Sequence, residues 1–168
     1  MNNLSVKNMV ILAFLAVIIT LQEEILTFLP NVQLTVFLLV LYSKKLGCKN
    51  TLLIVTLHVL FDNLWMASLN PIYMTFMWIG WAFIPILLST VFKNINKTIY
   101  LALCGILFSL LYSWIYILPN CLIYSMPFLA YLMADIIFEI ILSASSFLSI
   151  LWLYEPCSKV FDTYLRQE

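Results

Sequence analysis

Six apolar segments divide the chain, at residues 9–29, 31–43, 51–69, 73–92, 98–118 and 127–154. An α-helix needs about 20 apolar residues to cross the hydrocarbon core of a bilayer, and five of the six segments are long enough. Of the 168 residues, 64% are hydrophobic and 10% are charged, which lies far outside the usage of soluble domains. The sequence therefore predicts an all-α integral membrane protein with a single domain, residues 1–168.

The second segment, residues 31–43, is short enough to be a re-entrant or interfacial piece instead of a crossing. The distribution of basic residues favours a crossing. With six transmembrane helices and a cytoplasmic N-terminus, all eight basic residues fall on the cytoplasmic side, and the outer connections at 30–31, 70–71 and 119–120 contain none. The positive-inside rule thus predicts six spans with both termini cytoplasmic. The basic residues are Lys7, Lys44, Lys45, Lys49, Lys93, Lys97, Lys159 and Arg166.

Several carboxylates interrupt the apolar segments, and none of these segments contains a lysine or arginine. An ionised carboxylate near the bilayer centre costs on the order of 2.5 to 3.5 kcal/mol on insertion scales. We therefore expect the groups to be protonated, hydrated in a cavity, or paired with something that the protein does not contain.

Helical spacing gathers these acids with aromatic side chains, because residues three or four apart share a face. We expect the resulting stripes to converge on one cavity that faces the outside of the cell. Two structural roles that need no ligand are the alternatives. Some aromatic residues could anchor the helices at the membrane interface, and Asn63 could join helices by hydrogen bonds. The candidate substrate-binding residues are Glu23, Glu24, Asn31, Gln33, Asp62, Asn63, Trp78, Trp81, Tyr112, Tyr131, Asp135 and Glu139.

Other classes of function find little support in the sequence. Eight basic and eight acidic residues balance, so no nucleic-acid partner is indicated. The four cysteines show no CxxC spacing and the chain has one histidine, so we expect neither a metal site nor a bound cofactor. The chain lacks a P-loop and would not hydrolyse ATP by that route.

The chain departs from two intramembrane protease patterns. The EExxxR pattern of CAAX-type proteases fails, because Phe28 occupies the arginine position. Asp62 and Asp135 could face each other as in an intramembrane aspartyl protease, but their flanking residues match no such pattern. We expect no enzymatic activity.

Three stretches carry a resemblance that covers nearly the whole chain. They are LPNVQLTVFLLVLY (Leu29 to Tyr42), LHVLFDNLWMASLNP (Leu57 to Pro71) and MWIGWAFIP (Met77 to Pro85). Together with the six-helix pattern, they resemble the substrate-binding S component of an energy-coupling factor (ECF) vitamin transporter.

The resemblance implies a transporter subunit of a bacterial plasma membrane. Such a subunit captures a vitamin or related micronutrient outside the cell and docks on a transmembrane coupling subunit driven by two cytoplasmic ATPases. The family often docks through an AxxxA surface on its first helix. This chain has Ala16 and Thr20 at that spacing, with Ala13 one turn earlier, which departs from the pattern.

The acidic and aromatic candidate residues, with no basic residue near them, favour a cationic or neutral nitrogen heterocycle. Thiamine, its pyrimidine precursor and a queuine-like base are examples. The alternative from another class is a structural membrane scaffold of the MreD-like kind, which would need no ligand.

Overall fold

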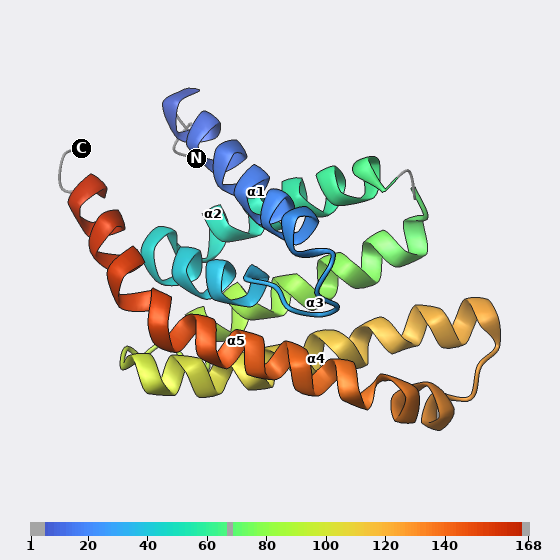
Figure 1. The fold of residues 1–168 in the computed structure, drawn as a ribbon. Coiled ribbons are helices and arrows are strands. Elements are labelled where there is room, and N and C mark those ends of the chain that lie inside the picture. Colours follow the sequence, from blue (N-terminus) through green and yellow to red (C-terminus); the bar gives the residue numbers. More distant parts are fainter. Residues whose placement is uncertain (1–5, 67–68, 166–168) are drawn as a thin grey trace.

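The computed structural model describes residues 6–66 and 69–165 of the chain, and within these residues it contains five helices and no strand (Figure 1). The four helices α1, α3, α4 and α5 are each long and apolar enough to cross a membrane. The all-helical, multi-pass membrane class predicted from the sequence is thus confirmed. The helices are α1 (Val6–Leu26), α2 (Thr35–Trp65), α3 (Pro71–Ser89), α4 (Thr98–Tyr124) and α5 (Phe128–Leu165).

Helix α2 consists of two halves that meet at a break. Gly47 has φ 81° and ψ 169°, which lies outside helical space and is accessible almost only to glycine. Figure 1 shows the chain reversing its direction there, so the second half returns along the bundle. The two halves correspond to the separate segments 31–43 and 51–69 expected from the sequence, but α2 is not among the four candidate spans.

The first half of α2 lies inside the bundle. All residues from Thr35 to Tyr42 are buried, and α1, α3, α4 and α5 form the rest of the helical bundle around the central core. A helix that is apolar on every side is expected to be enclosed by other helices. This burial explains how a segment too short for an ordinary span can still be stable.

The connection between α4 and α5 differs from the prediction. The sequence placed it at residues 119–120, but α4 continues through both Pro119 and Asn120 to Tyr124, and both side chains are buried. The chain turns instead at Ser125, which has a left-handed φ of 54°. Burial among neighbouring helices holds this proline inside the helix, although proline usually ends one.

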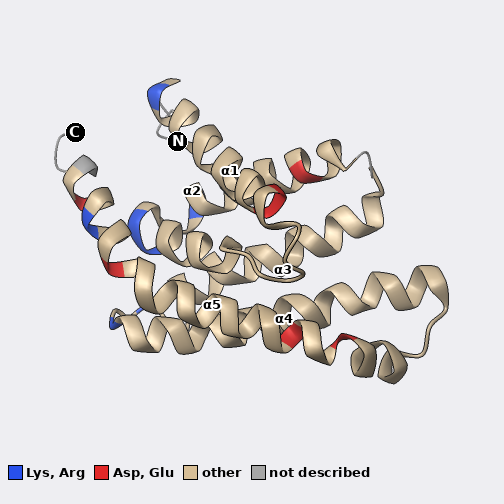
Figure 2. Cartoon of the chain, in the orientation of Figure 1, with Lys and Arg blue, Asp and Glu red and all other residues tan. Residues whose placement is uncertain are grey.

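Basic residues gather at one end of the bundle, which we call the lysine end (Figure 2). Its described lysines are Lys7, Lys44, Lys45, Lys49, Lys93, Lys97 and Lys159, while Arg166 lies outside the described residues. The Lys45 ammonium contacts the Asp162 carboxylate at 2.6 Å, which joins α2 to α5. Lys44 donates to the backbone oxygens of Phe92 and Lys93, each at 3.2 Å, after the end of α3.

Candidate functional site

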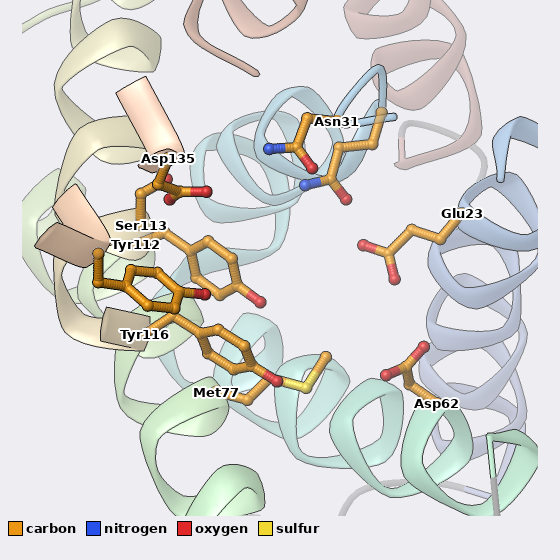
Figure 3. A pocket seen from close by; sticks show the side chains of 10 residues that line it. Glu23, Asn31, Asp62, Met77, Tyr112, Ser113, Tyr116 and Asp135 are labelled. Atoms are coloured by element: carbon orange, nitrogen blue, oxygen red, sulfur yellow. The ribbon is translucent and has the colours of Figure 1, made fainter. Parts of the chain in front are cut away.

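A cavity of about 330 Å³ lies between the helices, away from the lysine end. Every helix of the bundle and the α1–α2 loop contribute to its lining (Figure 3). The cavity is thus formed only when all five helices are assembled. The lining residues are Glu23, Asn31, Gln33, Asp62, Met77, Tyr112, Ser113, Tyr116, Tyr131 and Asp135.

The lining has two different walls. Glu23 of α1 and Asp62 of α2 lie together on one side, as Figure 3 shows, while Tyr112, Tyr116 and Asp135 lie on the other. We call the first the acidic wall and the second the tyrosine wall. Carboxylates therefore face the cavity from both sides.

Glu23 is held from behind the acidic wall. The hydroxyl of Thr35 donates to its Oε1, and Nε2 of the fully buried His58 lies 3.6 Å from its Oε2. His58 is positioned in turn by Thr20, whose Oγ1 lies 3.1 Å from Nδ1. These contacts fix the direction of the Glu23 carboxylate.

The α1–α2 loop, residues 27–34, covers one side of the cavity and is tied down at its end. The Gln22 side chain accepts from the backbone N–H of Leu34 at 2.7 Å and donates to Thr35 Oγ1 at 2.7 Å. Gln33 exchanges two hydrogen bonds with Ser145 of α5, at 3.2 and 3.0 Å. Asn31 adopts a φ of 59°, a conformation that asparagine tolerates better than most residues.

Stacked rings support the tyrosine wall. Trp81 and Tyr112 stack with centroids 3.7 Å apart and planes inclined by 14°, and Tyr112 stacks on Tyr116 at 5.7 Å. Gly80 makes room for this arrangement, because a Cβ there would lie 2.7 Å from Tyr112 Cδ2. The Tyr112 ring is thus confined on three sides.

A hydrogen-bond chain links three helices beside the cavity. The Tyr73 hydroxyl donates to Asn120 Oδ1 at 2.6 Å, and Asn120 Nδ2 donates to the Tyr131 hydroxyl at 3.1 Å. Asn120 performs this role because α4 continues past Pro119.

The carboxylates of Asp62 and Asp135 differ from that of Glu23. Within the described ranges, neither forms a hydrogen bond or an ion pair with another protein side chain or backbone group, and the cavity lining includes no Lys, Arg or His. A carboxylate can accept about four hydrogen bonds. The cavity therefore presents two acids whose full capacity to accept hydrogen bonds is left to a bound molecule or to water.

Seven of the twelve candidate binding residues line this cavity. These are Glu23, Asn31, Gln33, Asp62, Tyr112, Tyr131 and Asp135.

The other five candidates lie elsewhere. Asn63 is buried and donates to its own helix at Val59, and Trp81 is buried behind Tyr112. Trp78 donates to Thr56 at 3.0 Å on the exterior, and Glu139 is buried beside Trp114, whose Nε1 lies 3.4 Å away. Glu24 follows Glu23 on α1 but is not part of the cavity lining.

Three lining residues were absent from the candidate set. Tyr116 lies one turn after Tyr112 on α4, so helical spacing alone could have included it. Met77 and Ser113 carry no comparable signal, since apolar and small residues are common throughout the membrane-spanning segments.

The proposed docking residues are also placed differently from the expectation. Ala16 is completely buried and Thr20 is 8% exposed, while Ala13 is half-buried. Ala16 and Thr20 pack inside the bundle and cannot offer a surface to another subunit in this structure. The exposed face of α1 consists instead of large apolar side chains such as Phe14 and Leu21.

No family model, curated protein sequence or solved structure matches the chain. Among the residues that the structure describes, no group of three His, Cys, Asp or Glu side chains is placed to hold a metal ion. The four cysteines are free.

Proposed function

We propose that the chain is the substrate-capture subunit of an ECF-type importer, and that its cavity binds a vitamin or related micronutrient. The observation that carries the proposal is a cavity of about 330 Å³ lined by carboxylates and tyrosines, with no basic side chain to neutralise the acids. Ligand cavities in proteins typically measure about 300–1,000 Å³, which places this one at the small end.

The chemistry of the lining favours a cationic or neutral nitrogen heterocycle. Carboxylates accept charge-assisted hydrogen bonds from a positive or donor-rich ring, and tyrosine faces attract cations and flat rings. An anionic vitamin would instead meet like charges. Thiamine, its pyrimidine precursor and a queuine-like base remain the examples to test.

The proposal also includes the membrane topology of the chain. Six crossings with both termini cytoplasmic would require the two halves of α2 to act as separate spans, and the break at Gly47 is consistent with that arrangement. The gathering of lysines at one end supports a cytoplasmic assignment for that end. Cysteines introduced at Lys45 and Asn96 should react with an impermeant reagent only from inside, and one at Asn70 only from outside.

The proposal also includes protein partners. The subunit would dock on a transmembrane coupling subunit, with two cytoplasmic ATPases supplying the energy, in the plasma membrane of a bacterium. The absence of a P-loop from the sequence agrees with this division of labour. Because Ala16 is buried, a docking surface on α1 would have to use its exposed residues.

A ligand screen tests the proposal directly. Thermal unfolding of the detergent-purified protein should shift upward with one member of a vitamin panel, since a ligand stabilises the folded state that binds it. The Asp62→Asn variant should weaken that binding, whereas Glu139→Gln, a buried acid outside the cavity lining, should not. If no member of the panel binds and cells show no chain-dependent uptake, the capture function is wrong and the MreD-like scaffold is favoured.

A further inference from the structure

We propose that the ligand of this cavity is a flat cation with hydrogen-bond donors on two opposite edges, one edge meeting Asp62 and the other meeting Asp135. The inference rests on the proposed function in one respect only, that the cavity is a binding site. It adds the requirement that the ligand carries hydrogen-bond donors at both ends, which a single acidic subsite would not impose.

The first observation is the position of the two acids. Asp62 belongs to α2 and Asp135 to α5, and Figure 3 shows them on opposite sides of the cavity. A donor group that reaches one carboxylate is therefore directed away from the other. Satisfying both acids requires a molecule with donors at two ends.

The second observation is that both acids have unused acceptor capacity. Among the described residues, no lysine, arginine, amide or hydroxyl donates to either carboxylate. Glu23 differs, because Thr35 already donates to it and His58 lies 3.6 Å behind it. We infer that Glu23 is a positioned neighbour of the Asp62 subsite, while Asp62 and Asp135 receive the ligand's donors.

The third observation concerns the rings of the tyrosine wall, which favour a ligand that is flat between its two edges. Tyr112 and Tyr116 are stacked at 5.7 Å, and Trp81 supports Tyr112 from behind at 3.7 Å. Because Trp81 and Tyr116 cover the two faces of Tyr112, this ring meets the cavity with its hydroxyl end, and the rings form a fixed wall against which a rigid planar cation can pack. A flexible chain of similar charge would lose more conformational entropy on binding.

The two-edge requirement also gives a rule for exclusion. A ligand with donors on one edge would leave the acid at the far side without its charged partner. A ligand with a carboxylate would place like charges together at one of the two ends, which is unfavourable. The cavity should therefore select against both.

Two matched probes test the inference by calorimetric titration of the full-length protein in detergent. Benzamidine carries one planar amidinium, and benzene-1,4-dicarboxamidine carries a second at the opposite edge of the same ring. We expect the bis-amidine to bind roughly tenfold or more tightly than benzamidine, because each charged hydrogen-bond pair contributes that order of affinity. This comparison uses the unaltered protein and does not depend on the folding of any variant.

Variants then locate the two ends. Asp62→Asn and Asp135→Asn should each bring the affinity for the bis-amidine close to that for benzamidine. Glu139→Gln should leave it unchanged, because Glu139 lies one turn beyond Asp135 on α5 but outside the cavity lining. Thermal unfolding of each variant without ligand checks that it folds.

The outcomes separate this inference from the proposed function. Equal affinity for the two probes, or a loss confined to one of the two variants Asp62→Asn and Asp135→Asn, would overturn the two-edge inference, while vitamin binding and uptake would preserve the transporter proposal. Tight binding of the bis-amidine at both ends, in a chain that supports no uptake, would preserve the two-edge inference and overturn the transporter proposal. If neither probe nor any vitamin binds, both are wrong.

Discussion

Charged groups occur both at the lysine end of the bundle and at the end that contains the cavity, which we call the cavity end. Their surroundings differ between the two ends. At the lysine end, two of the lysines meet partners within the chain: Lys45 pairs with Asp162, and Lys44 donates to the carbonyls that follow α3. At the cavity end, Asp62 and Asp135 meet no such partner among the described residues.

This difference separates structural charges from charges left for another molecule. Intramembrane ionisable groups are costly and usually mark a functional path or site. A pair near the end of a helix bundle needs no such explanation, because water is available and the pairing energy is small. The comparison predicts that substitutions supporting the cavity will have larger effects than substitutions among the lysines.

The largest effect is expected from Thr35→Val. This change keeps the branched shape but removes the hydroxyl that donates to Glu23 and accepts from Gln22. We expect a loss of roughly 3 kcal/mol in the free energy of unfolding, because the half-buried Glu23 carboxylate loses a hydrogen bond. Reversible unfolding in mixed detergent and SDS measures it.

Thr163→Val is the control for that substitution. The Thr163 hydroxyl is exposed and, among the described residues, bonds only to Lys159 of its own helix, so its loss should change stability by less than about 0.5 kcal/mol. Equal losses at the two positions would break the proposed distinction between the ends.

The next effect concerns the tyrosine wall. In Gly80→Ala, the new Cβ would lie 2.7 Å from Tyr112 Cδ2, and that ring cannot move freely between Trp81 and Tyr116. Overpacking should cost roughly 2 kcal/mol and weaken ligand binding. Tryptophan fluorescence and thermal unfolding report the change.

Gly105→Ala is a matched comparison, because its Cβ would meet Cδ1 of Ile150 at 2.5 Å, the flexible end of a side chain. It should leave ligand affinity unchanged, since Gly105 is outside the cavity lining. A loss of binding in Gly105→Ala as large as that in Gly80→Ala would mean that the wall is not the cause.

A smaller effect is expected at the reversal of α2. In Gly47→Ala, the new Cβ would meet no atom of the described residues within 4 Å, so the expected cost is that of the backbone conformation with φ 81°. We expect a loss of roughly 1 to 2 kcal/mol in stability with ligand affinity preserved. An unchanged unfolding free energy would show that the chain can reverse here without glycine.

The smallest effect should come from the Lys45 and Asp162 pair. The Asp162 side chain is 50% exposed, so water screens much of the attraction. A double-mutant cycle with Lys45→Met and Asp162→Asn should give a coupling of about 0.2 to 1 kcal/mol that falls with added salt. A coupling of several kcal/mol would place this pair in a much drier setting.

The sequence predicted the helices better than their ends. Apolar length located each segment, because burying backbone groups in hydrocarbon leaves few alternatives to a helix. It failed at Pro119 and Asn120, where a proline and an amide indicated a turn. Their burial against neighbouring helices is a tertiary effect that no local pattern contains.

The cavity could be predicted in part for a similar reason. Charge identified Glu23, Asp62 and Asp135, since acids are rare in apolar helices. It also selected Glu139, which is buried beside Trp114 instead. The choice between these environments depends on the rotation of each helix against its neighbours, which composition and spacing leave undetermined.

The enclosed first half of α2 has a consequence for the order of assembly in the membrane. Residues Thr35 to Tyr42 leave the ribosome before α3, α4 and α5, yet these later helices complete their surroundings. The segment is short for an independent span and includes Thr35, whose partners lie on α1 and in the preceding loop. Until translation supplies the helices that enclose it, the segment must therefore lie beside α1, at the membrane surface or within the insertion machinery.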